Sequence, residues 1–197
     1  MPIVSTAKMT ARQFQELGED PAGVRLELVN GEVAVSPSPT PEHAHILIKL
    51  VRILDEHVSD RLGVLLHDVD TIFGEYDVRR PDVLFFTRKR AHLVERKRLK
   101  GPPDLAVEII SPSSSTIDRV DKYEQYEAGG VLHYWVIDPE VRTIEGFSLR
   151  RGKYRPVGRG QGTDLIALPP FPKLSIPLGR LWLPDFKNGK NGRKHRR

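Results

Sequence analysis

Hydrophobic and polar residues alternate along two early stretches of the chain, and this pattern predicts a β-hairpin. The run LELVNGEVAV contains two alternating segments joined by Asn30-Gly31. That dipeptide readily adopts the positive φ angles of a two-residue type I′ turn. We therefore expect strands at about 25–29 and 32–36.

Apolar residues at helical spacing predict a helix on each side of this hairpin. The first is short. Its start is indicated by Thr10, which can cap it, and by Gln13 three residues on, as in a capping box. The second begins where Thr40 can act as N-cap and Pro41 can occupy the first helical position. Its apolar spacing continues to about residue 59.

The remaining pattern alternates strands with one more helix. Ser114 or Ser115 can cap that helix, and Gly129-Gly130 ends it. The Pro-rich stretch that follows the strands is expected to be extended, with Trp182 packed against the body. Strands are predicted near 64–69, 82–87, 104–110, 131–138, 142–149 and 153–157. This order of elements predicts an α/β fold with a mixed sheet.

Length and composition narrow the class of protein. A chain of 197 residues with 39% hydrophobic and 29% charged residues suits one globular domain. It contains no Cys, which excludes disulfide scaffolds, thiolate metal sites and Cys nucleophiles. No apolar run reaches the roughly 18–20 residues that a membrane helix needs, and the first ten residues contain no apolar signal core. We expect a cytoplasmic protein without membrane association.

The positive charge of the chain is concentrated at its C-terminus. The net charge is +5. Residues 187–197, KNGKNGRKHRR, hold six Lys or Arg and no acid, so residues 1–186 carry 25 basic and 26 acidic residues. A polar segment of this kind cannot bury a core and is expected to be a disordered tail. It is either a solvated end or a non-specific phosphate contact.

Three charged residues occur in apolar surroundings, where a charge is costly unless it is paired or used. Asp82 opens the strand DVLFF, Glu108 lies inside LAVEII, and Lys122 follows on the predicted helix. Two carboxylates on neighbouring strands can hold Mg²⁺ or Mn²⁺, which lowers the pKa of a bound water. An ammonium beside them can orient that water and stabilise charge on a phosphate. The set therefore suits phosphodiester hydrolysis.

Three further groups are candidates for the same site. The backbone carbonyl of Ile109, next to Glu108, is a candidate metal ligand. Glu27 points away from the apolar residues beside it, because side chains alternate across a strand, and can reach the site from the hairpin. His43, in the first turn of the second helix, can meet a phosphate or a metal-bound water.

Each candidate also has a structural interpretation. An aspartate after a proline commonly starts a strand, and Glu108 can belong to a buried ion pair. Lys122 can lie on a solvated helix face, where Asp118 is four residues away. Glu27 can pair with a basic residue across the strands, and His43 can support the helix start or be exposed. Spacing alone leaves both interpretations open.

A basic run adds a second question about phosphate binding. Residues 88–100, RKRAHLVERKRLK, contain seven Lys or Arg in thirteen positions. Such a run is usually a solvated loop. Beside a carboxylate–metal site it would instead clamp phosphates.

Three stretches resemble, in order, the blocks of the Uma-type restriction-endonuclease-like family in the PD-(D/E)XK nuclease superfamily: LELVNGEVAVSPSPTPEHAHI, RRPDVLFF and PPDLAVEIISPSSSTIDRVDKYEQYEAGGVLHYWVIDP. The resemblance covers roughly residues 10–185. It implies that Asp82 is the family's first acid and Glu108 its second. The superfamily's lysine normally stands two residues after that acid, where this chain has Ile110. In this family the lysine has moved to the next helix, which implies Lys122.

The resemblance also places Glu27 and His43 at the family's hairpin acid and helix-start histidine. It implies a restriction-endonuclease-like core, in which helices flank a central mixed β-sheet behind an N-terminal helix and hairpin. One domain is expected over 1–186, with the tail over 187–197. The implied function is metal-dependent hydrolysis of DNA, with Mg²⁺ or Mn²⁺ as cofactor and a homodimer as the assembly. The alternative is a non-catalytic nucleic-acid-binding or regulatory protein on a retained nuclease fold.

Overall fold

A computed structural model describes residues 8–36, 38–58, 61–96, 98–111 and 117–184, apart from the side chains of 36 and 117–119. All structural statements below concern these residues. The predicted basic tail, 187–197, and the two serines proposed to cap the third helix lie outside the described residues.

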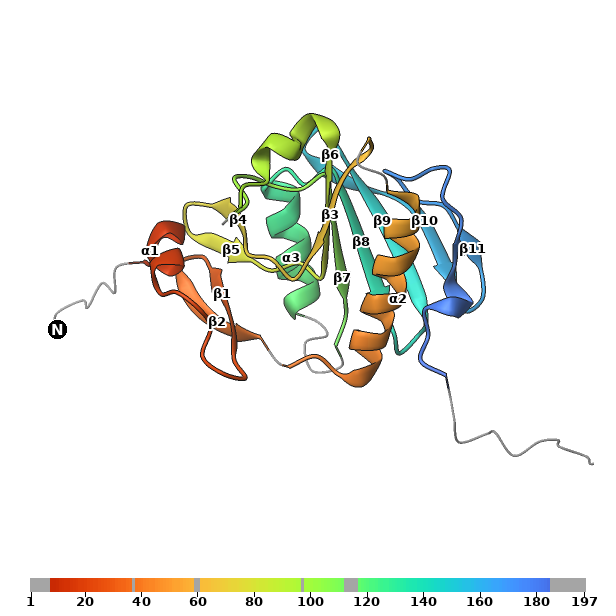
Figure 1. Ribbon diagram of the computed structural model, residues 1–197, viewed down its shortest axis with the longest axis horizontal. Coiled ribbons are helices and arrows are strands. Elements are labelled where there is room, and N and C mark those ends of the chain that lie inside the picture. The colour runs from red at the N-terminus through yellow and green to blue at the C-terminus, as the bar shows by residue number, and fades with distance from the viewer. Residues whose placement is uncertain (1–7, 37, 59–60, 97, 112–116, 185–197) are drawn as a thin grey trace, which may run out of the picture.

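Helices and strands follow one another much as the hydrophobic pattern predicts (Figure 1). In chain order the described elements are α1 (Ala11–Glu16), β1 (Arg25–Val29), β2 (Glu32–Ser36), α2 (Pro41–His57), β3 (Gly63–His67), β4 (Thr71–Gly74), β5 (Asp77–Arg79), β6 (Val83–Thr87), η1 (Arg88–Leu93), β7 (Leu105–Ile109), α3 (Ile117–Ala128), β8 (His133–Asp138), β9 (Thr143–Arg150), β10 (Lys153–Gln161), β11 (Leu165–Ile166), β12 (Ile176–Pro177) and η3 (Leu178–Arg180). The α-helices among them do not include one long and apolar enough to cross a membrane.

The central sheet is mixed, as predicted. Its six strands lie in the order β10-β9-β8-β7-β6-β3. Strands β7 and β8 are parallel, and the other neighbours are antiparallel. The parallel pair requires a crossover connection, which α3 supplies. A second sheet, in the order β2-β1-β5-β4, carries the predicted hairpin.

The two long helices cover opposite faces of the six-stranded sheet (Figure 1). Leu50 and Leu54 of α2 pack against Val107 in the larger core cluster. On the other face, Tyr126 of α3 packs against Ala106. Because side chains alternate along a strand, the side chain of residue 108 faces α3.

Local signals in the sequence produced the predicted turns and helix starts. Asn30 and Gly31 have φ angles of 51° and 83°, as a type I′ turn requires. The Thr10–Gln13 capping box is present. Thr40 caps α2 through the backbone N–H of His43, and α2 ends at residue 57, two residues before the predicted end.

The main differences concern strands that depend on distant partners. The short strands β4 and β5 carry too few residues to show a period, and the pattern did not predict them. Strand β10 continues to residue 161, four residues past the prediction, because β9 pairs with it along its whole length. Its glycines permit close packing: a Cβ at Gly158 or Gly160 would lie 2.7 Å or 2.9 Å from a leucine side chain. The Pro-rich segment is not extended throughout as predicted, because it contains turns and η3. Its Trp182 packs against the body as predicted, on the α2 face.

Candidate active site

The pairing of β6 with β7 places the two predicted acids side by side. Val83 pairs with Val107 and Leu84 with Ala106 in an antiparallel register. Continued by one residue, the same register sets Asp82 opposite Glu108, and opposite residues of a pair share one face of the sheet. Both side chains are buried. The two carboxylates therefore meet at one end of the central sheet, on the face that α3 covers.

Asp82 is held by groups from β7 and α2. Its Oδ2 accepts a hydrogen bond of 2.7 Å from the backbone N–H of Ile109. The Nε2 atom of His43 lies 3.1 Å from the same oxygen. His43 is 7% exposed, and its Nδ1 has no hydrogen-bond partner among the described residues. The capped start of α2 thus brings a buried histidine to the first acid.

Glu108 is held by two side chains one turn apart on α3. The Nζ of Lys122 lies 2.8 Å from Oε2, and the hydroxyl of Tyr126 donates a hydrogen bond of 2.5 Å to Oε1. Burial raises the pKa of Glu108 to about 7; the charge of Lys122 opposes this rise and that of Asp82 adds to it. Burial and the charge of Glu108 raise the pKa of Tyr126 well above its ordinary value, so its hydroxyl stays a donor.

Glu27 reaches the same region from the hairpin. It accepts hydrogen bonds from Nη1 of Arg79, at 3.0 Å, and from the backbone N–H of Arg80, at 2.9 Å. Burial acts to raise the pKa of Glu27, but the charges of Lys122 and Arg79 hold that pKa below its ordinary value. Glu27 and Lys122 therefore belong to one electrostatic network, which joins the small sheet to α3.

The structure supports some of the structural interpretations of these residues and not others. Glu27 does pair with a basic residue across the strands: Leu28 pairs with Val78, so Arg79 lies opposite Glu27 and binds it, whereas Arg25 pairs with Asp68. His43 is buried, not exposed. The Lys122 side chain is 13% exposed and contacts Glu108, so it does not lie on a solvated helix face. The side chain of residue 118 lies outside the described residues.

Sequence reasoning missed two members of this network. Tyr126 donates to Glu108, and its spacing of four residues from Lys122, which is typical of a shared helix face, is the signal that could have identified it. Arg79 is 4% exposed and joins Glu27 to Gln125, which in turn donates to Asp77. No local pattern marks Arg79, because its partners are distant in the chain.

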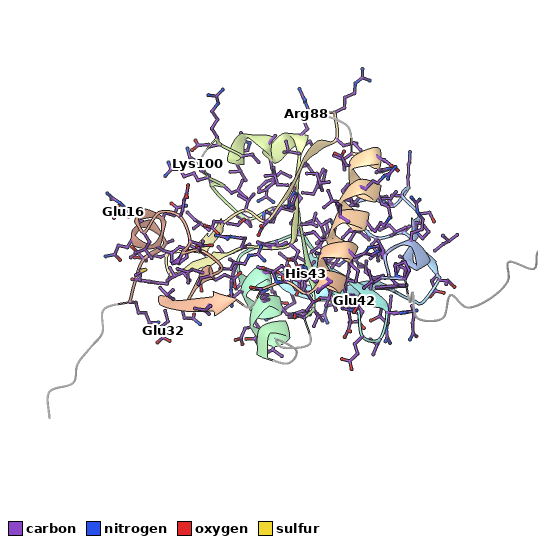
Figure 2. All side chains as sticks on the ribbon, turned by 60° about the horizontal axis from the view of Figure 1, so that its bottom comes forward. Glu16, Glu32, Glu42, His43, Arg88 and Lys100 are labelled. Atoms are coloured by element: carbon purple, nitrogen blue, oxygen red, sulfur yellow. The ribbon has the colours of Figure 1, made fainter. Side chains whose placement is uncertain are left out.

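The basic run at 88–100 does not lie beside these acids. Strand β6 separates Asp82 from Arg88, and its five residues span about 17 Å. Figure 2 shows Arg88 and Lys100 projecting from the edge of the molecule opposite to His43. Lys100 and Arg98 pair with Glu95. The strand direction thus favours the solvated-loop interpretation over a phosphate clamp at the site.

Comparison with known proteins identifies the family and the fold. The family model described as "Uma2: Putative restriction endonuclease" matches residues 11–179. The chain belongs to the Uma2 family. A crystal structure of "a putative nuclease belonging to DUF820" from Anabaena variabilis superposes with a TM-score of 0.72 and 21% sequence identity, covering 88% of this chain and 97% of that one. This likeness confirms the predicted nuclease-like mixed α/β fold. No curated protein matches the chain.

Uma2 membership raises the question of whether these residues fit a divalent metal, which restriction-endonuclease-like nucleases typically use. Carboxylate oxygens are the hard ligands that Mg²⁺ prefers. Asp82 raises the pKa of Glu108, so the two charges repel, and a cation between them would relieve that repulsion. The described residues contain no group of three His, Cys, Asp or Glu placed to hold a metal. Mg²⁺ usually binds one or two carboxylates and keeps several waters, so the donor chemistry fits such an ion.

Proposed function

We propose that this protein is a metal-dependent endonuclease that hydrolyses phosphodiester bonds of DNA. Membership of the Uma2 family and the nuclease-like fold support a nuclease. The observation that carries the finer proposal is the position of Asp82 opposite Glu108, with the Nζ of Lys122 2.8 Å from Glu108. Two acids and one ammonium at a buried strand end suit metal-assisted phosphodiester hydrolysis.

Three groups would hold the cation, Mg²⁺ or Mn²⁺. These are the carboxylates of Asp82 and Glu108 and the backbone carbonyl of Ile109. In a strand the N–H and C=O of one residue point to the same side, and the N–H of Ile109 already donates to Asp82. Its carbonyl is therefore directed toward the same side of β7 as Asp82. Bound there, a divalent cation would supply Lewis acidity, which lowers the pKa of water and offsets phosphate charge.

Lys122 has two roles in this proposal. Its charge opposes the rise that burial causes in the pKa of Glu108, and this favours the anionic carboxylate. Its ammonium can also orient a water and stabilise negative charge on the substrate phosphate.

His43 and Glu27 support the acids and the lysine in this proposal. His43 lies 3.1 Å from Asp82, and the hydrogen bond between them would fix the direction of that carboxylate. Glu27 lowers the electrostatic cost of a buried Lys122 while the Arg79 contact holds the hairpin in place. Both residues would therefore act by positioning the groups that contact substrate and metal.

A cleavage assay tests the proposal. Supercoiled and single-stranded DNA are incubated with the protein and Mg²⁺ or Mn²⁺. Glu108→Gln and Lys122→Met should each lower the cleavage rate by roughly 100-fold or more. Glu56→Gln, an exposed acid of α2, should leave the rate unchanged. Cleavage that persists in Glu108→Gln would exclude the assigned site.

One observation favours the second candidate, a non-catalytic nucleic-acid-binding protein. Each oxygen of Glu108 already accepts a hydrogen bond, from Lys122 or Tyr126, as in a structural ion pair. Calorimetric titration with Mn²⁺ separates the two functions. The endonuclease requires binding that Asp82→Asn weakens. Absence of binding at millimolar Mn²⁺, together with DNA binding that weakens with salt, would support the non-catalytic protein.

A further inference from the structure

The turn between β8 and β9 lies at the same end of the central sheet as the candidate active site. Strands β7 and β8 are parallel, and Glu108 pairs with Val136 in their register. Residues 139–142, which follow β8, therefore leave the sheet at the end that carries the paired acids. Figure 1 shows this turn at the same edge of the molecule as the start of α2, the helix that brings His43 to Asp82.

This turn presents an arginine on a fixed backbone. Arg142 is exposed and forms no ion pair with another described residue. Its φ angle is 53°, which is uncommon for a residue other than Gly, Asn or Asp. The carboxylate of Asp138 accepts hydrogen bonds from the backbone N–H groups of Glu140 and Val141. The carbonyl of Arg142 accepts a further bond, from the N–H of Gly162. The turn thus holds the backbone of an exposed cation in place.

A second exposed arginine lies on the adjoining segment. Gly162 belongs to the next turn of the chain, in which the carbonyl of Asp164 accepts a bond of 2.9 Å from the N–H of Leu178. Leu178 begins η3, and Arg180 ends it. Arg180 is also exposed and forms no ion pair within the described part of the chain. Arg142 and Arg180 therefore stand on segments that touch one another, and we call this pair of arginines the basic rim.

The arginines on the other side of the site are already neutralised. On the side of the small sheet, Arg25 pairs with Asp68, Arg79 with Glu27, and Arg80 with both Asp20 and Asp70. A guanidinium that is bound to a carboxylate offers less charge to a phosphate. Because a nucleic-acid backbone is attracted by cations, it would leave the site on the side where the arginines are unpaired.

We propose that the basic rim binds backbone phosphates of DNA on one side of the bond that is cleaved. This rests on the proposed function, because it takes DNA to be the substrate of the site at Asp82 and Glu108. Strand β9 lies two strands from β7, so the backbone of Arg142 is about 10 Å from that of Glu108, measured across the sheet. The rim would therefore position the substrate without contacting the reacting atoms. Phosphate contacts carry no sequence information, so this binding is expected to be independent of sequence.

Anisotropy of a fluorescein-labelled DNA duplex, measured with the full chain in EDTA so that the duplex is not cleaved, tests the proposal. Arg142→Asn and Arg180→Gln should each weaken binding about fivefold or more. Each should also lower the slope of log affinity against log salt by about one, since one phosphate contact is lost. Asparagine tolerates positive φ, so Arg142→Asn removes the charge and keeps the turn. Arg142→Lys keeps the charge and should retain most of the affinity.

The chain provides a matched control at the opposite end of the sheet. Arg151 is exposed, has a φ angle of 54° and lies in the turn between β9 and β10. Arg151→Asn therefore removes the same charge from the same backbone conformation, and it should leave duplex binding unchanged. Glu140 is an exposed acid in the same turn as Arg142. Glu140→Gln should strengthen binding, because it removes a repulsion of the phosphates.

Steady-state cleavage separates this proposal from the proposed function. Variants of the basic rim should raise KM more than they lower kcat. Glu108→Gln should abolish cleavage without weakening duplex binding. Cleavage that persists in Glu108→Gln would refute the assigned catalytic site, whereas the basic rim stands or falls by the anisotropy of its own variants.

Three results would overturn the proposal for the basic rim. The first is unchanged affinity and salt slope in Arg142→Asn and Arg180→Gln. The second is an equal loss in Arg151→Asn, which would show only a general effect of charge. The third is an Arg142→Lys variant as weak as Arg142→Asn, which would show that the charge is not the cause. Melting temperatures of all variants identify any loss that comes from unfolding.

Discussion

Replacing Glu108 by Gln should change how the stability of the protein depends on pH. The carboxyl of Glu108 has a pKa of about 7 in the folded chain, against 4.5 as its ordinary value, because it is buried. Folding therefore raises its affinity for a proton. Its contribution to the free energy of unfolding is largest below pH 4.5 and falls as pH rises toward 7.

The size of this effect follows from the two pKa values. Their difference corresponds to a loss of about 3 kcal/mol between pH 4 and pH 8. Glutamine cannot ionise, so Glu108→Gln removes this loss. The melting temperature of the variant minus that of the wild type should therefore be roughly 6–12 °C higher at pH 8 than at pH 4, since 1 kcal/mol is worth about 2–4 °C in a domain of this size.

Urea or thermal unfolding of both proteins between pH 4 and pH 8.5 measures the difference, and titrating groups that do not interact with Glu108 cancel because they are common to both. Mg²⁺ at pH 8 should stabilise the wild type, because a bound cation favours the ionised carboxylate. It should stabilise Glu108→Gln much less. Parallel stability curves for the two proteins would refute the inference that burial raises the pKa of Glu108 in the folded protein.

Three further predictions concern single side chains. Tyr126→Phe leaves one oxygen of a buried carboxylate without its donor, so chemical denaturation should show a loss of about 1–3 kcal/mol. Leu54→Ala on α2 leaves a cavity at a fully buried position and should lower the free energy of unfolding by about 2–5 kcal/mol in the same assay. Ile48→Ala, at a position of the same helix that is 67% exposed, should lower it far less. Gly31→Ala should lower the free energy of unfolding by about 1 kcal/mol or more, because φ is +83° there and the added Cβ would lie 2.6 Å from the Cβ of Lys8. An unchanged denaturation midpoint would contradict the expectation for any of these variants.

Where a structural decision depends on residues adjacent in the chain, the sequence was sufficient to predict it. The turn at Asn30-Gly31 depends on two residues that tolerate positive φ. The starts of α1 and α2 depend on Thr10 and Thr40, whose side chains accept bonds from N–H groups three residues on. These contacts form within one turn of chain, so local chemistry determines them.

Strands with distant partners were harder to predict. Strands β4 and β5 have four and three residues and gain their hydrogen bonds from each other and from β1. Strand β10 persists through a bulge near Gly158 because β9 lies beside it. In both cases pairing across the sheet overrides weak local preference.

The candidate site shows the same division. Charge placed in apolar runs was enough to select Asp82 and Glu108 from the sequence, because a buried charge needs a partner or a use. The sequence alone could not show that the β6–β7 register sets them opposite each other, or that Ile109 donates to Asp82. The direction of β6, likewise, carries residues 88–100 to the far end of the sheet. Residue type is a property of the chain, whereas proximity of distant residues exists only after the strands have paired.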